Sequence, residues 1–544
     1  MNHQLNKVSP RVFWPSAGII AIFVAAALII PGSLKRLLTT VNGSVVNGLG
    51  WYYVLIVVGF VAVALYAAFS RYGEIKLGRE EDAPRYSLFT WFSMLFAAGM
   101  GIGLVFWGVA EPLVHFASPP PGSRAQDAPG RAQEAMTTTF LHWGVHAWAI
   151  YIVIGLAVAF ASHRKGRPMS MRWMLEPLFG DRVKGVLGDV IDITAVVGTL
   201  FGVATSLGFG VTQFAAGLEH LGVVKQSIGL LVILVAVITA MVTLSVSSGL
   251  DRGIKWLSNS NLVLAGILMI AVLLLGEPLF VLREFVQSLG EYIQNFIHLS
   301  FRTMPYRGEE GEAWLGGWTT YYWGWWMSWS PFVGVFIARI SRGRTVREFI
   351  LGVMLVPTLL TFLWFSVLGG TALWREVGGG GGLVGKDGEV DTTSALFDLL
   401  ATLPGSTVLI GLFMLLIVVF FVTSSDSASF VVDMIAHGGN PNPPLRSRVF
   451  WAVAQGTIAA ALLWVGSRQG ALTDGLSALQ TMAILVAAPF SVVMVLTSIA
   501  TIKALHQEHR RRVAAQERVI AAELERQITT VVEEQLDGAT TASR

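Results

Sequence analysis

Aromatic side chains at helical spacing are the most prominent residues of this sequence that could carry chemistry. The densest group lies in WTTYYWGWWMSWSPF, residues 318–332, where four rings fall at positions i, i+3, i+4 and i+7: Tyr322, Trp325, Trp326 and Trp329. Such spacing places them in one stripe on one face of a helix. The negative faces of aromatic rings attract diffuse positive charge, especially a quaternary ammonium group, which cannot donate a hydrogen bond. The stripe therefore predicts a cation-binding aromatic box, with ordinary packing between helices as the alternative.

A second aromatic group lies in HWGVHAWAIY, residues 142–151. In a helix, Trp143, Trp148 and Tyr151 fall within a sector of about 140° at 3.6 residues per turn. Two helices would thus present aromatic faces to one binding region. Such a box needs no acidic residue if the ligand is a zwitterion, because the ligand's own carboxylate balances its positive charge.

Three glycines interrupt the apolar run FAAGMGIGLVFWGVAEP, residues 96–112: Gly99, Gly101 and Gly103. One interpretation is close helix packing through the small residues Gly99 and Gly103. The other is an unwound segment whose freed carbonyl groups point into a cavity, which a membrane interior tolerates only where backbone lines a site or is buried in protein. Carbonyl oxygens suit a hard cation such as sodium.

A cluster of hydroxyls and one carboxyl lies inside another apolar run, FFVTSSDSASF, residues 420–430. Hydroxyl groups of Thr and Ser in a helix can simply bond back to their own backbone. Asp426 is harder to explain in this way, because a charged group in a membrane span is costly and usually faces a partner or an interior path. A break at the glycine run and this hydroxyl cluster would together make an oxygen cage for an alkali ion.

The elements that position these residues are predicted to be membrane-spanning helices. The 544 residues are 53% hydrophobic and only 13% charged, whereas soluble domains carry about a quarter of charged residues. The absence of cysteine excludes disulfides, zinc–thiolate sites and cysteine nucleophiles. Apolar stretches of about 20 residues predict twelve spans, near residues 13–31, 51–70, 88–110, 138–162, 188–218, 228–248, 259–282, 318–340, 348–374, 405–436, 448–466 and 473–500.

An even number of spans puts both termini on one side of the membrane. Of the 38 lysines and arginines, 27 fall on the terminal side of these spans, so the positive-inside rule predicts that both termini face the cytoplasm. Residues 1–12 then form a short cytoplasmic N-terminus, 283–317 an external amphipathic helix, and 501–544 a cytoplasmic C-terminal helix. That tail is either a solvated amphipathic helix or a regulatory arm that touches anionic membrane lipid or a neighbouring subunit.

Other classes of function find little support in the sequence. Basic residues are spread over many short connections, so no footprint for nucleic acid emerges. His142 and His146 stand at i and i+4, but no third ligand follows nearby, which favours packing over a metal site. No nucleophile–base pair points to an enzyme, and no cofactor besides a coupling ion is expected. A passive channel for small solutes is the rival to a transporter.

The sequence resembles the betaine/choline/carnitine transporter (BCCT) family from about the second span to the twelfth. The resemblance rests on four segments in order: GMGIGLVFWGVAEP, HWGVHAWAIY, WGWWMSWSPFVGVFIARISRGRTVREFI (323–350) and TSSDSAS. It implies an all-α integral membrane protein with a LeuT-like core of two inverted five-helix repeats, spans three to seven (88–282) and eight to twelve (318–500). Two peripheral helices (13–87) would precede this core, and a homotrimer in a bacterial plasma (inner) membrane would be the usual assembly.

The same resemblance implies roles for individual residues. The central aromatic box would consist of Trp143, Trp148, Tyr151 and Trp326, with Trp325 and Trp329 lining the path towards the cytoplasm and Gly99, Gly101 and Gly103 bordering the solute. A sodium ion between the repeats would take the carbonyls of Ala97, Met100 and Phe420 and the hydroxyls of Thr423 and Ser424. A possible second sodium site would involve Thr199 and Phe332, with Val203 standing where a further hydroxyl is expected. Trp318 would be an outer aromatic position on the entry route, or an interfacial belt residue.

Two departures from other patterns of the family narrow the expected solute and coupling. Members that take up choline with protons tend to carry Asp at the position of Gly103, so a carboxylated zwitterion such as glycine betaine fits better. Met100, Thr423 and Ser424 fit the sodium-dependent pattern rather than that of sodium-independent carnitine exchangers. The resemblance therefore implies a sodium-coupled symporter of a betaine-like compatible solute. A sodium-independent or proton-coupled choline- or carnitine-type transporter or exchanger is the alternative.

Overall fold

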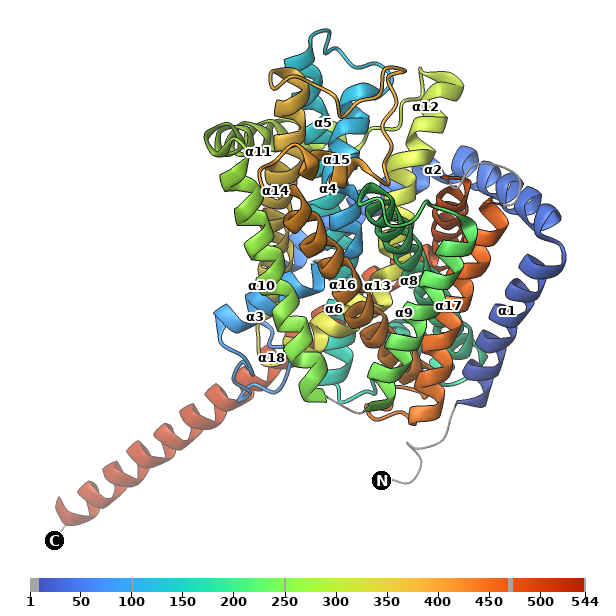
Figure 1. The fold of residues 1–544 in the computed structure, drawn as a ribbon. Coiled ribbons are helices and arrows are strands. Elements are labelled where there is room, and N and C mark those ends of the chain that lie inside the picture. The colour runs from blue at the N-terminus through green and yellow to red at the C-terminus, as the bar shows by residue number, and fades with distance from the viewer. Residues whose placement is uncertain (1–8, 100, 249–250, 468–472, 543–544) are drawn as a thin grey trace.

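The computed structural model describes residues 9–99, 101–248, 251–467 and 473–542, and these ranges fold mostly into helices (Figure 1). Within them, strand-like pairing amounts to an isolated bridge between Lys76 and Thr345. The α-helices are α1 (Pro10–Ile29), α2 (Pro31–Phe69), α3 (Leu88–Gly99), α4 (Ile102–Ala117), α5 (Ala128–Trp143), α6 (Val145–Ala159), α7 (Glu176–Phe179), α8 (Val186–His220), α9 (Ile228–Ser248), α10 (Asp251–Leu275), α11 (Pro278–Ser300), α12 (Gly308–Leu315), α13 (Tyr321–Ile340), α14 (Val346–Val377), α15 (Ala395–Ala401), α16 (Ser406–Ala436), α17 (Leu445–Ser467) and α18 (Thr473–Ala542).

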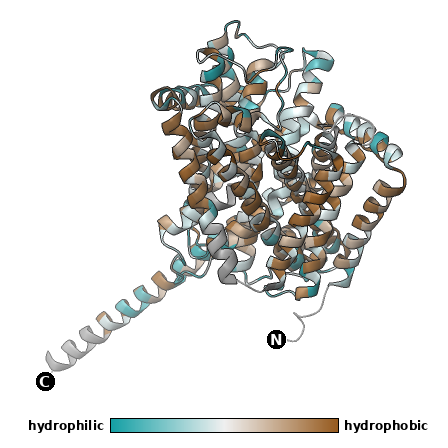
Figure 2. Ribbon diagram, in the orientation of Figure 1, coloured by the Kyte–Doolittle hydropathy of each residue, from teal (hydrophilic) through white to brown (hydrophobic). Residues whose placement is uncertain are grey.

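Long apolar helices make up the body of the protein. Among the described residues, nine helices are long and apolar enough to cross a membrane, and the bent pair α10–α11 would supply a tenth. Figure 2 shows hydrophobic residues concentrated along the middle of the bundle and hydrophilic residues gathered towards its two ends. The chain is therefore an all-helical, multi-pass membrane protein, in agreement with the expectation from its composition.

The predicted apolar stretches fall on helices, but several helix bounds differ from the prediction. Helix α2 begins at Pro31, separated by one residue from the end of α1 at Ile29, rather than near residue 51. Helix α18 continues without interruption from the last apolar stretch into the polar tail and reaches 70 residues. Both differences have the same cause: a hydropathy scan registers only the apolar part of a helix, whereas the backbone stays helical through polar residues until something breaks it.

The glycine run interrupts its helix. Helix α3 ends at Gly99 and α4 begins at Ile102, and Gly101 between them has extended backbone angles, φ −153° and ψ −177°. Met100 lies outside the described residues, as do the side chain of Ala97 and the surroundings of Gly99. The interruption leaves the last carbonyls of α3 without partners inside the helix.

The predicted continuous helix over 138–162 is wrong, because the chain breaks at Gly144. Helix α5 starts earlier, at Ala128, and ends at Trp143, and α6 starts at Val145. Gly144 has non-helical angles, φ −96° and ψ −137°. A methyl group there would lie 2.6 Å from the carbonyl oxygen of Phe140 and 2.7 Å from Cζ of Phe362, so close packing against α14 reserves this position for glycine.

Helix α11 turns sharply away from the helix before it. The apolar part of α10, Ser260–Leu275, and α11 are bent by 110° relative to each other. In Figure 1, α11 lies at the edge of the bundle, next to the upper parts of α5 and α14. It carries the apolar and charged residues predicted for an external amphipathic helix.

Several connections meet at the end of the bundle that holds both termini (Figure 1). The amide of Ser9, before α1, donates to the carbonyl of Ala436 at the end of α16, at 3.2 Å. The connections before α3 and before α14 pair with each other, because the amide of Gly343 donates to Leu77 and that of Leu77 to Arg344, both at 2.8 Å. These contacts tie segments from both halves of the chain together at one face.

Candidate solute and ion sites

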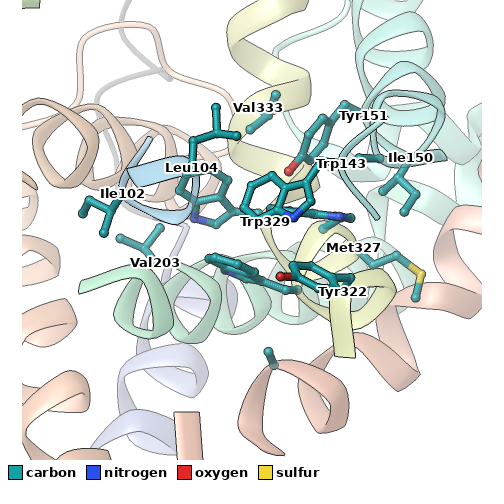
Figure 3. Packing of buried hydrophobic residues seen from close by; sticks show 14 of the residues in the cluster. Ile102, Leu104, Trp143, Ile150, Tyr151, Val203, Tyr322, Met327, Trp329 and Val333 are labelled. Carbon is teal, nitrogen blue, oxygen red and sulfur yellow. The ribbon is translucent and has the colours of Figure 1, made fainter. Parts of the chain in front are cut away.

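An interior cavity lies between the start of α4 and the helices α5, α6, α13 and α14. Its described lining residues are mostly aromatic: Gly101, Gly103, Leu104, Trp143, Ala147, Trp148, Tyr151, Trp325, Trp326, Trp329 and Thr361. The structure thus brings together the six aromatic residues predicted for solute binding, with Gly101 and Gly103 beside them. The cavity volume is about 30 Å³, room for about one water molecule. Figure 3 shows Trp143, Tyr151 and Trp329 close together, with Leu104 of α4 nearby.

The aromatic rings that line the cavity contact one another both edge-on and stacked. Trp143 lies edge-on to Trp326, with ring centroids 4.9 Å apart and planes at 69°, and Trp325 stacks on Trp326 at 4.7 Å and 15°. Trp148 meets Tyr151 edge-on at 5.4 Å and 75°. These are the preferred arrangements of aromatic pairs. Because the rings stand at different angles, some present a face to the cavity and others an edge. The faces can attract a cation.

The helix break at Gly144 anchors one wall of the box. The indole N–H of Trp326 donates to the carbonyl of His142 at 2.9 Å. In an unbroken helix this carbonyl would accept from the amide four residues later, so the break frees it for α13. The sequence prediction was therefore right that the rings of 142–151 converge with α13, and wrong that one continuous helix carries them.

The glycines at the start of α4 permit the rings to approach the backbone. A methyl group on Gly103 would lie 2.7 Å from Cη2 of Trp325 and 3.0 Å from Cη2 of Trp143. One on Gly101 would lie 3.5 Å from Cη2 of Trp329. Gly103 therefore has no space for a side chain while these rings keep their positions.

Sequence reasoning missed Glu111, which is fully buried on α4. Its Oε1 lies 2.6 Å from Nδ1 of His142, and its Oε2 accepts the indole N–H of Trp143 at 2.6 Å and the hydroxyl of Tyr322. Potential ligand atoms of Glu111, His115 and His142 all lie within 4.8 Å of one another. At 2.6 Å, the contact between Glu111 and His142 is a hydrogen bond, so we interpret the group as a polar network. A carboxyl at the end of an apolar span was the signal available in the sequence.

His142 and His146, predicted to be packing residues, contact different neighbours in the structure. His146 Nε2 lies 2.9 Å from the hydroxyl of Ser300, and its ring stacks on that of Trp323 at 5.5 Å and 22°. His142 faces Glu111 instead. The packing interpretation of His146 is the one that its contacts support.

A larger cavity lies at the end of the bundle opposite the termini. It has a volume of about 400 Å³, and Trp107 and Trp318 line it together with residues of the connection before α15 and of α18. Trp318 is half-buried in a π-helical turn (Gly316–Thr320) and packs on His115 at 4.3 Å. The ring of Trp107 lies 6.1 Å from Tyr322, which stacks on Trp326 at 5.7 Å. Aromatic rings thus separate this outer cavity from the box.

Thr423 and Phe420, two of the predicted sodium ligands, lie together on α16. The hydroxyl of Thr423 donates to the carbonyls of Val419 at 2.9 Å and Phe420 at 3.3 Å. This is the back-bonded arrangement that the sequence left open as an alternative. Ser424 is half-buried on the same helix. Ser425 and Ser429 bind elsewhere, to Gln455 of α17.

Thr199, predicted for a second sodium site, is fully buried on α8. Its hydroxyl has no hydrogen-bond partner among the described residues. Helices α8 and α13 approach closely next to it, because a methyl group on Gly202 would lie 2.9 Å from Oγ of Ser328 and 3.1 Å from Cδ1 of Trp329. Phe332, the other predicted ligand, is half-buried on α13, and its ring lies 5.7 Å from that of Trp329.

Comparison with known proteins places the chain among transporters. The family described as "BCCT, betaine/carnitine/choline family transporter" matches residues 11–510. The chain is 42% identical over 507 residues to a glycine betaine transporter of Bacillus subtilis, covering 93% of this chain and 96% of the relative. It is 49% identical over 507 residues to an uncharacterised transporter of Mycobacterium tuberculosis (92% and 83%) and 41% identical over 514 residues to a glycine betaine transporter of Acinetobacter baylyi (94% and 76%).

The fold is that of a multi-pass helical membrane protein, and the family match and the named relatives make it a transporter and not an enzyme. The match over nearly the whole chain and the identities above make the assignment specific. The chain belongs to the betaine/carnitine/choline (BCCT) family of transporters.

Proposed function

We propose that this protein is a sodium-coupled symporter that takes up a betaine-like onium solute by alternating access. The observation that carries the proposal is the cavity between α6 and α13, which is bordered by six aromatic residues. None of its described lining residues is acidic. A quaternary ammonium group is the cation that ring faces alone can hold, because it has no hydrogen to donate to a carboxylate.

A zwitterion fits the cavity better than a bare cation. The indole N–H groups of Trp325 and Trp329 are buried there without hydrogen-bond partners among the described residues. Such donors are available to a solute carboxylate. Gly103 leaves no room for the aspartate of proton-coupled choline transporters, since Cη2 of Trp325 stands 2.7 Å from any added methyl group. The named relatives from Bacillus subtilis and Acinetobacter baylyi are glycine betaine transporters, which supports the same solute here.

Sodium is proposed to bind between the carbonyls at the end of α3 and the hydroxyls of α16. The carbonyls of Ala97, Met100 and Phe420 and the hydroxyls of Thr423 and Ser424 are the proposed ligands. The hydroxyl of Thr423 lies 3.3 Å from the carbonyl oxygen of Phe420, and a hydroxyl that donates to backbone keeps its oxygen lone pairs for a cation. A second ion near Thr199 and Phe332 is supported by the unpartnered, buried hydroxyl of Thr199.

Transport would follow from rearrangement around the box. The box encloses about 30 Å³ and the outer cavity about 400 Å³, so a solute reaches the box only when its rings move apart. We propose that Trp318 receives the solute on the way in. Solute between α6 and α13 and sodium between α3 and α16 would each stabilise the same closed arrangement, which is how two ligands become coupled. The two inverted five-helix repeats would then rock against each other.

The proposed setting is a bacterial plasma membrane with both termini in the cytoplasm. Both termini lie at one end of the bundle (Figure 1), and the predicted spans place most basic residues at that end. We propose a homotrimer as the assembly, with membrane lipid around it. The tail of α18 is proposed to be regulatory, and its base is held by ion pairs of Glu508 with Arg164 and Lys165.

Uptake of radiolabelled glycine betaine into proteoliposomes tests the proposal. Accumulation that requires an inward sodium gradient is the expected result. Exchange that ignores sodium would keep the aromatic box but replace symport by a sodium-independent mechanism. Equilibration without accumulation under any gradient would indicate a passive channel instead.

A further inference from the structure

Glu111 lies outside the described lining of the cavity, yet its carboxylate touches one of the box rings. Its Oε2 accepts the indole N–H of Trp143 at 2.6 Å and the hydroxyl of Tyr322. Its Oε1 lies 2.6 Å from Nδ1 of His142. An indole N–H can only donate. Trp143 therefore turns its N–H edge towards Glu111 while its ring borders the cavity.

The hydrogen bonds around Glu111 fit an ionised carboxylate. A protonated carboxyl would have to donate its hydrogen to Nδ1 of His142, whereas a carboxylate accepts from all three neighbours. His142 fits this arrangement, because with hydrogen on Nδ1 its Nε2 can accept from the hydroxyl of Thr319, 3.1 Å away. The other titratable neighbour is His115, whose Nε2 lies 3.4 Å from Oε1. An acidic group buried at this depth in a membrane protein marks a functional site more often than simple packing.

We propose that Glu111 tunes the box for positive charge by orienting the Trp143 indole and polarising it through the N–H. This inference rests on the proposed function, because it requires an onium group in the cavity. A hydrogen bond from an indole N–H to an anion shifts electron density into the ring, and a more negative ring face attracts a cation more strongly. Glu111 is thus a positioning residue that acts through Trp143 and does not touch the solute.

This placement solves a problem specific to zwitterions. A carboxylate that lined the cavity would attract the ammonium group of the solute but repel its carboxylate. With Trp143 between them, the negative charge of Glu111 reaches the solute mainly through the ring that faces its ammonium group. The box would then discriminate by charge and not only by shape.

Equilibrium binding to the full-length protein in lipid nanodiscs, with sodium present, tests the inference. The two ligands are glycine betaine and 3,3-dimethylbutyrate, which has the same shape and carboxylate but carbon in place of the charged nitrogen. Wild-type protein is expected to prefer glycine betaine. Glu111→Gln keeps the size and an acceptor oxygen but removes the charge, and should lower that preference about tenfold. The affinity for 3,3-dimethylbutyrate should stay within about twofold.

A matched control is Glu284→Gln. Glu284 is also largely buried, but it lies on α11 and accepts from Ser288, away from the box. This variant should keep the wild-type preference. A similar loss of preference in Glu284→Gln would mean that charge removal acts through general loosening of the protein, and would overturn the inference.

Trp143→Phe keeps the inference testable if Glu111→Gln does not fold. Phenylalanine retains a ring face but has no N–H, so the preference should fall by a similar factor. Where Glu111→Gln does fold, the double variant should add little further loss. Equal weakening of both ligands, or an unchanged preference, would overturn the inference while leaving the proposed solute site intact. A wild-type protein that does not prefer glycine betaine would overturn both.

Discussion

The aromatic box and the proposed sodium site are built from different materials. The box consists of large rings that hold one another, such as Trp326 between Trp325 and Trp143, and of hydrogen bonds to His142 and Glu111. The sodium site would consist of backbone carbonyls and short hydroxyls on two helices, α3 and α16. Side-chain packing fixes the first locally. The second exists only when two separate helices stand at the right distance.

This difference suggests that the two regions would have different functions. A site assembled from two separate helices would depend on their relative position, so a bound ion would favour the conformation in which the box is able to close. In the proposed mechanism, the box itself would recognise the solute. Variants in the box should therefore change solute affinity directly, whereas variants on α16 should change the sodium dependence first.

The largest expected effect comes from removing a central ring. Trp326→Leu should reduce glycine betaine affinity by about 100-fold or more and abolish measurable uptake, because it removes a cation–π surface and a packed indole together. Binding and proteoliposome uptake measure this. Trp51→Leu is the matched control, since Trp51 is exposed on α2 and should transport normally. Unchanged uptake by Trp326→Leu would break the assignment of the box.

A methyl group at the tip of α4 should weaken the box less severely. Gly103→Ala would press on Trp325 and Trp143, and overpacking of this kind costs about 1–3 kcal/mol, roughly 5- to 150-fold in affinity. Gly411→Ala is the control, because a methyl group there meets nothing within 4 Å. Wild-type binding by Gly103→Ala would show that the rings stand elsewhere during solute recognition.

A substitution on α16 should change the sodium dependence of uptake without changing the binding of the solute. Thr423→Ala removes one proposed ligand and should raise the sodium concentration for half-maximal uptake about tenfold. A tenfold change corresponds to the loss of about one hydrogen bond to a charged group. Uptake is measured across a sodium series at saturating solute. Thr457→Ala removes a hydroxyl with the same bond to its own helix, Val453 at 2.8 Å, and should change nothing. An unaltered sodium dependence in Thr423→Ala would contradict the proposed site.

The smallest expected effect lies outside both regions. Glu508→Gln breaks the ion pairs with Arg164 and Lys165, so protease should cleave the tail of α18 faster. Uptake should stay within about twofold, because these residues lie apart from both proposed sites. Glu525→Gln, on the exposed part of the same helix, is the control. A loss of uptake as large as that of Trp326→Leu would mean that the tail controls the box directly.

Hydropathy and helical spacing predicted much of this protein. Apolar stretches located the helices, and the spacing of Tyr322, Trp325, Trp326 and Trp329 predicted one buried aromatic face on α13, which the structure has. For the glycine run, a break before α4 was one of two interpretations, and the structure has that break. These features follow from the chain's local sequence, because helix formation and the direction of side chains on a helix depend on nearby residues.

Other features could not be predicted in this way. The break at Gly144 depends on Phe362, more than 200 positions away in the chain, which packs against the missing side chain. Whether Thr423 bonds to its own helix or to an ion depends on what the neighbouring helix brings to it. Neither partner is visible from spacing along one segment.

The sequence by itself therefore determined that this is a helical membrane protein with aromatic faces on two segments, and it allowed a glycine break before α4 as one of two interpretations. The tertiary structure alone decided that those faces close on one small cavity, that the freed carbonyl of His142 holds Trp326, and that Glu111 accepts from Trp143. The physical reason is the distance along the chain over which each interaction acts. Periodicity and backbone freedom act within a few residues, whereas a hydrogen bond between two helices exists only after the chain has brought them together.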